Sequence, residues 1–307
     1  GLWSVPAVLS FIAWCISSFL CLFMNKYTLS TLGVEAFFFS LIQIAVSVVL
    51  GFINMYIPCY MGKPTKDWGR RSQKFYTSMG FVGISRFLVV FLSLLSLEYV
   101  AVSFTETVKS SAPLFTVVIS WLVVGERNGL PVLLSLIPIM LGLMMCTHYE
   151  ASYNMMGFMA AMGTNLAECL QFVLSKKALS TDITKTTPAE FQFYSCLAST
   201  VIQLPICLFF MDYSTAFDST TMLTFAWMLV NGLMYHVQTM TAWVLMEYVS
   251  PVTHSVCNTV KRAMAIWLSI YFYGNPVTFL GGVGTVVVIL GVLFYNKARE
   301  HEQNSFK

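Results

Sequence analysis

The sequence predicts an all-α membrane protein, with ten transmembrane helices arranged as two inverted five-helix repeats. Its 307 residues are 57% hydrophobic and only 10% charged, with a mean hydropathy of +0.73, whereas a soluble domain has about 25% charged residues. The apolar residues form ten separate runs, and a short motif recurs about half the chain apart. The composition therefore excludes a soluble domain, and the recurring motif indicates an internal repeat.

Five apolar runs fill the first half of the chain, and each has about the 20 residues that cross a hydrocarbon core of roughly 30 Å. They are residues 5–25, 34–58, 75–97, 101–124 and 130–148. Turn-forming residues separate them, as in Gly62–Pro64 before the third run and Gly125–Gly129 before the fifth. We expect residues 1–150 to form the first five-helix half.

Five more runs of similar length fill the second half. They are residues 153–175, 188–211, 221–246, 251–273 and 277–296. Polar or turn-forming stretches end several of them, such as Ser180–Asp182, Asp212–Ser214 and Gly274–Pro276. We expect residues 151–307 to form the second five-helix half, and because no soluble domain fits between the runs, the two halves make one domain.

The basic residues orient the ten runs. Twelve of the 17 lie in alternate connections or at the C-terminus, so they share one side of the membrane. They are Lys63, Lys66, Arg70, Arg71, Lys74, Arg127, Lys176, Lys177, Lys185, Lys297, Arg299 and Lys307. The positive-inside rule then places both termini on the cytosolic side or its equivalent. The cluster before the third run is also expected to contact anionic lipid.

A repeated motif supports the division into halves. Glu-Tyr-Val begins at Glu98 and again at Glu247, and Thr-Val-Lys follows each copy, ending at Lys109 and Lys261. The second interval is three residues longer, so the match is imperfect. Because five is an odd number of crossings, the second copy is inverted, and such repeats place a binding site near the midplane between them. The fourth and ninth runs are therefore expected to face one cavity.

Four cations lie inside apolar runs: Arg86, Lys109, Lys261 and Arg262. The adjacent Lys261 and Arg262 have no acidic residue within a helical turn, and a charge at membrane depth costs roughly 2.5–3.5 kcal/mol on insertion scales. We therefore expect an anion to bind reversibly to Lys261 and Arg262. Lys109 follows Glu106 by three residues, so Glu106 can neutralise it in the empty protein. The alternative is a purely structural ion pair between helices.

Other polar residues inside the runs are weaker candidates. Arg86 lies on a thin serine stripe (Ser78, Ser85 and Ser93), as either a site residue or a structural anchor. Asn165, Glu168 and Gln171 share one helix face, where a structural role is favoured over pairing with Arg86 or binding substrate. Thr105, Gln238 and Asn258 are further candidates, and His236 and His254 are expected to be hydrogen-bonded core residues.

The charge count favours a phosphate group as the visiting anion. A phosphomonoester carries about −1.5 to −2 charge with three acceptor oxygens. Arginine offers a planar fork for two oxygens and lysine a compact charge. A carboxylate or chloride needs fewer donors. An empty cavity with uncompensated cations should also resist closing, because closure strips their water, so we expect exchange of one anion for another.

Several classes of chemistry have no counterpart in the sequence. The eight cysteines lie scattered through the apolar runs without the spacing of a metal site, so they are expected to be buried core residues. No paired catalytic carboxylates or nucleophile–base spacing stand on a connection, which disfavours a membrane enzyme. We expect no metal, cofactor or nucleic-acid partner. The residues carry no signal for an oligomeric state.

Two stretches carry a resemblance to a known family. Ser103–Leu114 reads SFTETVKSSAPL, and Ser250–Thr278 reads SPVTHSVCNTVKRAMAIWLSIYFYGNPVT. With them, the chain resembles the triose-phosphate translocator family of the drug/metabolite transporter superfamily. The first stretch is most similar to the animal-type solute carrier family 35 member E2 proteins, as are Ser135–Leu143, Glu190–Tyr194 and Tyr295–Glu300.

The resemblance implies ten helices in two inverted halves and strict exchange of inorganic phosphate for phosphorylated three- to six-carbon compounds. It also implies a phosphate clamp of Lys109, Lys261 and Arg262, with a further role for Lys26. A family tyrosine that touches substrate falls at Gln238 here, which puts the plastid substrates in doubt. The whole predicted substrate-binding set is Lys26, Arg86, Thr105, Lys109, Gln238, Asn258, Lys261 and Arg262.

We therefore expect an antiporter that exchanges sugar or triose phosphates for inorganic phosphate by alternating access. The alternatives are a nucleotide-sugar transporter of the same fold, which needs a larger cavity, and a non-transporting membrane scaffold, which should tolerate loss of Lys261 and Arg262. The resemblance to the solute carrier family 35 member E2-type proteins favours a location in the Golgi or another endomembrane, with the plastid envelope as the alternative.

Overall fold

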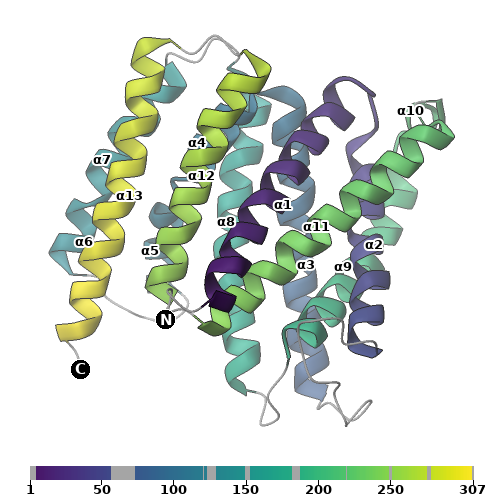
Figure 1. The fold of residues 1–307 in the computed structure, drawn as a ribbon, viewed down its shortest axis with the longest axis horizontal. Coiled ribbons are helices and arrows are strands. Elements are labelled where there is room, and N and C mark those ends of the chain that lie inside the picture. Colours follow the sequence, from purple (N-terminus) through teal and green to yellow (C-terminus); the bar gives the residue numbers. More distant parts are fainter. Residues whose placement is uncertain are drawn as a thin grey trace. The chain divides into compact units, whose positions relative to one another are not determined.

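The structure is a computed structural model that describes residues 5–56, 73–119, 121–122, 129–148, 153–181, 187–218, 220–248, 251–274 and 278–305. Within these ranges every regular element is a helix (Figure 1). The helices are α1 (Val5–Ser30), α2 (Ala36–Tyr56), α3 (Gln73–Tyr99), α4 (Val102–Lys109), α5 (Ala112–Ile119), α6 (Leu130–Leu134), α7 (Leu136–His148), α8 (Met155–Thr181), α9 (Pro188–Phe210), α10 (Tyr213–Asp218), α11 (Met222–Tyr248), α12 (Pro251–Tyr273) and α13 (Phe279–Ser305). The predicted all-α class is confirmed.

Each of the ten apolar runs contains a described helix. Five helices, α1, α2, α3, α9 and α13, are long and apolar enough to cross a membrane by length and composition. Three others, α8, α11 and α12, have 27, 27 and 23 residues, which is also long enough. Polar residues within them lower their mean hydropathy. The chain is a multi-pass integral membrane protein.

Two of the predicted runs are each divided into two helices. The run 101–124 forms α4 and α5, which are separated by Ser110 and Ser111, and the run 130–148 forms α6 and α7, which are separated by Ser135. In both places the serine hydroxyl donates to a backbone carbonyl of the preceding turn. Such bonds compete with the continuing helix ladder. The sequence prediction of single uninterrupted helices is wrong at these two points.

The chain folds into two compact units, each built from both halves of the sequence. The first unit comprises Gly1–Leu94 and Leu170–Tyr248, and the second comprises Leu95–Cys169 and Val249–Lys307. Two of the three boundaries fall inside α3 and α8, and the third follows the end of α11. Most of the basic residues predicted to orient the chain lie outside the described residues; Lys63, Arg70 and Arg127 are examples.

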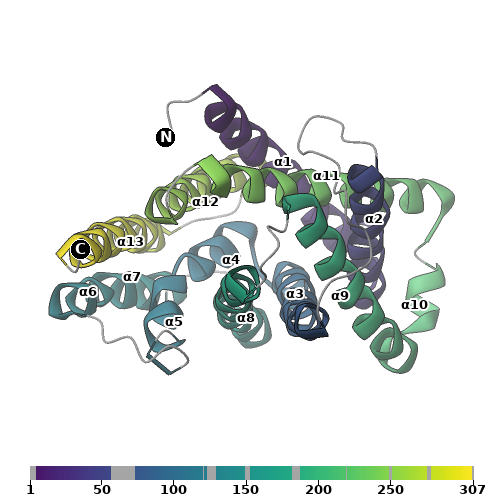
Figure 2. The ribbon, with the colours of Figure 1, turned by 90° about the horizontal axis from the view of Figure 1, so that it is seen from below.

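In the first unit α1 runs along α11, and α2 packs against both α9 and α11 (Figures 1 and 2). Gly232 of α11 brings its backbone close to the Val46 side chain of α2, and Gly51 of α2 does the same against Phe193 of α9. Small residues let helix backbones approach closely, as is typical of membrane bundles.

In the second unit α13 packs along α7 and also contacts α12, and α12 packs on α4 (Figure 1). The contact between α7 and α13 depends on Gly142, because a Cβ there would lie 2.6 Å from the Gly284 carbonyl oxygen. The core of this unit includes Phe104, Val108 and Val288, each at most 1% exposed. This packing holds α4 and α12 side by side.

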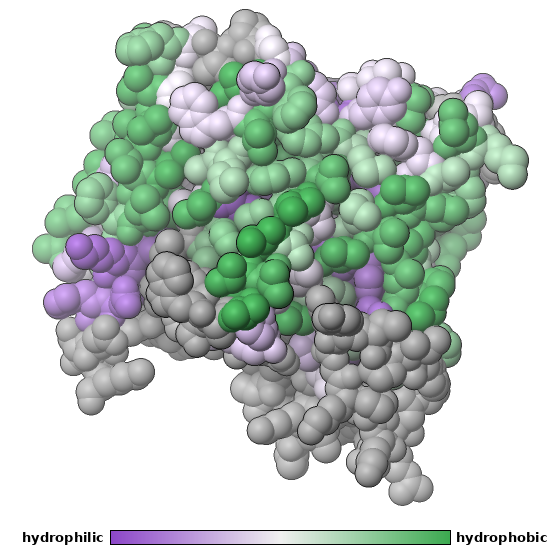
Figure 3. Space-filling model, in the orientation of Figure 1, coloured by the Kyte–Doolittle hydropathy of each residue, from purple (hydrophilic) through white to green (hydrophobic). Residues whose placement is uncertain are grey.

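Apolar side chains also dominate the outer surface. Leu9, Ile16 and Trp267 are exposed by 54% or more, and in Figure 3 hydrophobic colours cover large parts of α1, α12 and α13. Polar colours gather near the C-terminal end of α13. Such a surface suits contact with lipid chains rather than water.

Candidate functional site

The predicted site residues are divided between the two units. Lys109, Lys261 and Arg262 lie in the second unit with Thr105 and Asn258. The other three belong to the first unit: Lys26, Arg86 and Gln238. Each group is described by itself below.

Lys109 is the last residue of α4. Its Nζ is 3.3 Å from Glu106 Oε1, and both side chains are nearly buried. The pairing that the spacing predicts is therefore confirmed. Glu106 also interacts electrostatically with Arg262 and Lys261 of α12, so this one carboxylate lies within the field of three cations.

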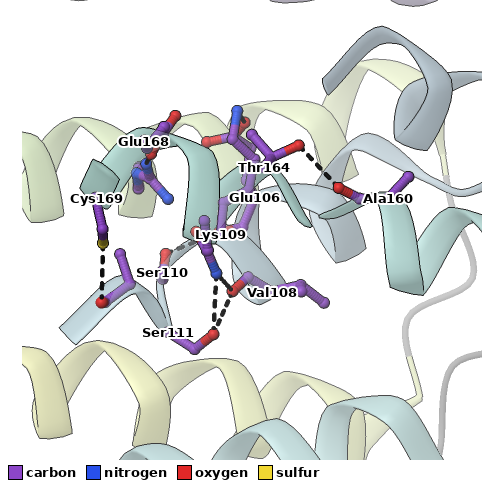
Figure 4. Close-up of polar contacts among 12 residues, drawn as sticks. Glu106, Val108, Lys109, Ser110, Ser111, Ala160, Thr164, Glu168 and Cys169 are labelled. Atoms are coloured by element: carbon purple, nitrogen blue, oxygen red, sulfur yellow. Dashed lines mark hydrogen bonds and ion pairs between the residues drawn. The ribbon is translucent and has the colours of Figure 1, made fainter. Parts of the chain in front are cut away.

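The break after α4 is held by a side chain from α8 (Figure 4). The Asn165 amide donates to the Val108 carbonyl at 2.8 Å and to Ser111 Oγ at 3.1 Å. The Ser110 hydroxyl donates to the Glu106 carbonyl at 2.8 Å. These bonds satisfy polar groups that an interrupted helix leaves without partners, and they fix the position of Lys109. Asn165 thus has the structural role that the sequence favours.

Arg262 has an acidic partner from another helix. Its Nη2 lies 2.8 Å from Glu168 Oε2 of α8, and the Arg262 side chain is 8% exposed while that of Glu168 is 30% exposed. The expectation that the cations of α12 stand uncompensated in the empty protein is therefore wrong. That expectation considered only carboxylates within one helical turn of Lys261 and Arg262, whereas Glu168 lies 94 residues before Arg262 in the chain. Glu168 pairs with Arg262 and not with Arg86.

The pairing leaves one terminal nitrogen of Arg262 open. Nη1 is buried and has no hydrogen-bond partner among the described residues. Lys261 interacts electrostatically with Arg262, Glu106, Lys109 and Glu168. These five side chains, called the basic cluster below, carry three positive and two negative formal charges. The net positive charge and the unused donor suit an anion with several acceptor oxygens.

Two predicted neutral donors accompany the basic cluster on its helices. The buried Thr105 hydroxyl lies 3.0 Å from the Ser96 hydroxyl. Asn258 is half-buried on α12, one turn before Lys261 and Arg262.

Arg86 lies on α3 in the first unit and is only 1% exposed. Its Nη1 donates to Tyr235 Oη at 3.4 Å and to Cys196 Sγ at 3.5 Å. Lys26 is half-buried near the end of α1, and Gln238 is half-buried on α11.

The sequence analysis missed a polar network in the first unit. Gln43 of α2 donates to Asn25 of α1 at 3.2 Å and to Asn231 of α11 at 2.7 Å, and Asn231 donates to Asn25 at 2.7 Å. The sequence does contain a signal for this network, because each of three apolar runs includes an amide side chain: Asn25, Gln43 and Asn231. His236, with Nε2 2.9 Å from Asn54 Nδ2, is a hydrogen-bonded core residue as predicted.

The predicted burial of cysteines is confirmed where the structure describes them. Cys15, Cys21, Cys169, Cys196, Cys207 and Cys257 are all buried and free. Cys59 lies outside the described residues, as does the side chain of Cys146.

Comparison with known proteins gives a consistent assignment across the chain. The family model of the Triose-phosphate Transporter family matches residues 5–296. The phosphoenolpyruvate/phosphate translocator 3, chloroplastic, of Oryza sativa subsp. japonica is 35% identical over 67% of this chain and 54% of its own. The triose phosphate/phosphate translocator, chloroplastic, of Solanum tuberosum is 33% identical over 69% of this chain and 53% of its own.

A third relative is the glucose-6-phosphate/phosphate translocator 1, chloroplastic, of Arabidopsis thaliana, with 32% identity over 66% of this chain and 54% of its own. The chain thus spans about half the length of the curated relatives it matches. A solved crystal structure aligns over 95% of both chains with a TM-score of 0.58 and 13% identity. That likeness concerns the fold alone.

Proposed function

Because this chain belongs to the Triose-phosphate Transporter family, we propose that it is an antiporter exchanging phosphorylated small metabolites for inorganic phosphate across a membrane. The names of the relatives supply the substrate class, since they pair phosphate with phosphoenolpyruvate, triose phosphate or glucose 6-phosphate. The observation that carries the proposal is the basic cluster, with its net positive charge and the open Nη1 of Arg262. It is a transporter and not an enzyme.

The substrate's phosphate binds to Arg262 in two steps. The two terminal nitrogens of a guanidinium form one edge that fits two oxygens of a phosphate. Glu168 occupies Nη2 of this edge and leaves Nη1 open. Phosphate first meets Nη1, Lys261 and Lys109, and it then displaces the Glu168 carboxylate. Thr105 and Asn258 supply neutral hydrogen bonds beside these charges.

Glu106 and Glu168 reduce the positive charge of the basic cluster when no phosphate is bound, but they do not neutralise it. After phosphate leaves, Glu168 and Glu106 compensate two of the three cations. One positive charge remains, and stripping its water during closure is unfavourable. A bound phosphate removes that penalty. The transporter therefore reorients readily with an anion bound and slowly without one, which produces exchange.

Alternating access follows from the proposed architecture of ten transmembrane helices in two inverted five-helix repeats, residues 1–150 and 151–307. The repeated Glu-Tyr-Val motif and the helical content of all ten apolar runs support it. Lys26, Arg86 and Gln238 of the first unit are separately proposed to contact substrate. Gln238 stands where the family resemblance implies a tyrosine, so phosphate binding carries over to this chain but the exact substrate list of the plastid carriers does not.

We assign the protein to the Golgi or another endomembrane, as the resemblance to solute carrier family 35 favours. The plastid envelope is the alternative, because the relatives are named as chloroplastic proteins. Co-localisation of the tagged full-length protein with markers of each membrane decides between them.

Counter-exchange in proteoliposomes tests the proposed function. Uptake of labelled phosphate is measured into vesicles loaded with phosphate, with triose phosphate, with a nucleoside monophosphate, or with no anion. We expect rapid uptake into the phosphate- and triose-phosphate-loaded vesicles and slow uptake into empty ones. Equal uptake into empty vesicles contradicts exchange. Dependence on internal nucleoside monophosphate indicates a nucleotide-sugar transporter instead, and no uptake anywhere indicates a scaffold.

A further inference from the structure

An open apolar groove lies between α12 and α13 on the surface of the second unit, with a volume of about 360 Å³. Val260, Met264 and Trp267 line it from α12, and they are 40%, 45% and 59% exposed. Ile289 and Leu293 line it from α13. In a multi-pass membrane protein such a surface faces lipid chains. The groove therefore suits a hydrocarbon chain.

The α13 side of the groove leads directly to two charged residues. Ile289, Leu293 and Lys297 are spaced by four residues, so they share one face of the helix. Glu300 continues that face three residues further on. The predicted apolar run ends at residue 296, and Lys297 lies about 6 Å beyond Leu293 along the helix axis. The groove is thus at the depth of the lipid chains, and the two charges are at the depth of the headgroups.

The two charges, which we call the headgroup pair (Lys297 and Glu300), are both exposed and have no printed-distance ion pair or hydrogen bond among the described residues. Their charged neighbours are engaged within the protein. Arg299 Nη1 donates to Tyr295 Oη at 3.1 Å, and the Glu302 carboxylate accepts from the Gly129 amide. In Figure 3 polar colours accordingly gather at this end of α13, beyond the hydrophobic surface of α12 and α13.

From this arrangement we propose that the groove and the headgroup pair bind a phospholipid whose phosphate is followed by an amine, such as phosphatidylethanolamine. Along α13 the order is apolar groove, cation, anion, and along the lipid it is chain, phosphate, ammonium. Lys297 attracts the phosphate and Glu300 attracts the ammonium. A headgroup without an amine would leave Glu300 beside a negative charge. The proposal does not rest on the exchange function, because no residue of the basic cluster lines the groove.

Native mass spectrometry of the detergent-purified protein tests the headgroup pair, through the fraction of protein that retains one added lipid. Phosphatidylethanolamine and phosphatidylglycerol with identical chains are compared. The wild-type protein should retain phosphatidylethanolamine about fivefold more, as one charge contact at a membrane surface allows. Glu300→Gln should lower this ratio toward one, and Lys297→Gln should lower retention of both lipids about fivefold. Equal retention of the two lipids by the wild type overturns the proposal.

The groove itself is tested by Trp267→Ala, which removes part of its wall. Retention of both lipids should fall severalfold, because packing contacts with the chain are lost. Trp121→Ala is the matched control, since Trp121 is 58% exposed and is not among the lining residues. Unchanged retention in Trp267→Ala, or an equal loss in Trp121→Ala, means that lipid covers the surface without a seat in the groove, which overturns the proposal.

Thermal unfolding in detergent gives a second readout and checks folding. A ligand that binds the folded state raises its melting temperature, so phosphatidylethanolamine should stabilise the wild type more than phosphatidylglycerol does. Lys297→Gln and Glu300→Gln change exposed side chains, and without added lipid they should melt at the wild-type temperature. Glu300→Gln should then be stabilised equally by both lipids. Equal stabilisation of the wild type by both lipids contradicts the proposed order of charges.

Discussion

At the scale of single residues, the proposed phosphate site depends on which carboxylates balance the cations of α12. Local spacing predicts the Glu106–Lys109 pair, because residues three apart share a helix face. It does not predict the Arg262–Glu168 pair, since the two residues come from helices far apart in the sequence. The same limit explains why Glu168 was considered as a partner for Arg86. The positions of the buried basic residues could be predicted from the sequence. Their partners on other helices could be identified only from the three-dimensional structure.

Glu168→Gln should increase the affinity for phosphate. Removing the carboxylate frees Nη2 of Arg262, so phosphate no longer competes with a resident anion. Because Glu168 is 30% exposed, the competing pair contributes roughly 0.2–1 kcal/mol, which corresponds to a decrease in KM of up to about fivefold. The KM for phosphate homo-exchange in proteoliposomes measures this effect. Glu300→Gln on the exposed surface of α13 serves as the control, and a raised KM in Glu168→Gln contradicts displacement.

At the scale of helices, the sequence predicted where most helices lie, but it did not predict that the runs 101–124 and 130–148 are each divided into two helices. Runs of about 20 apolar residues predicted where helices form. Hydropathy does not mark the end of α4 in the run 101–124, although Pro113, the second residue of α5, cannot donate to the Lys109 carbonyl and so disfavours a continuous helix. Asn165 of α8 stabilises the break, because it bonds to the Val108 carbonyl and Ser111. The position of Lys109 is thus supported by a tertiary contact that the sequence does not reveal.

Gly142→Ala should destabilise the second unit through its α7–α13 contact. The new Cβ would lie 2.6 Å from the Gly284 carbonyl oxygen and 2.8 Å from the Val288 amide nitrogen. Both are backbone atoms that cannot rotate away, so the helices must separate, at about 1–3 kcal/mol. We expect a melting temperature in detergent lower by several degrees.

Gly80→Ala is the matched control for this helix contact. A Cβ at Gly80 of α3 meets nothing within 4 Å, and alanine favours a helix over glycine by up to about 1 kcal/mol. The melting temperature should therefore stay the same or rise. Equal losses in both variants would show that glycine is needed for some reason other than close helix packing.

At the scale of the whole molecule, the compact units and the sequence halves divide the chain differently. The halves 1–150 and 151–307 come from a repeated motif, whereas each unit combines segments from both halves. Contacts within a membrane bundle follow helix packing, and they need not follow the order of the chain. The sequence therefore indicated the fold class but could not indicate which helices pack together, and the inverted repeat stays a prediction.

In the proposed function, the basic cluster of the second unit binds the phosphate of the transported anion. Its most direct test is phosphate homo-exchange in proteoliposomes for Lys261→Gln and Arg262→Gln, with Lys297→Gln on the exposed face of α13 as the control. Each cluster variant should lose about 10- to 100-fold in kcat/KM, as expected for a charge-assisted hydrogen bond, while the control keeps the wild-type value. Wild-type exchange by correctly folded Lys261→Gln and Arg262→Gln proteins would contradict the claim.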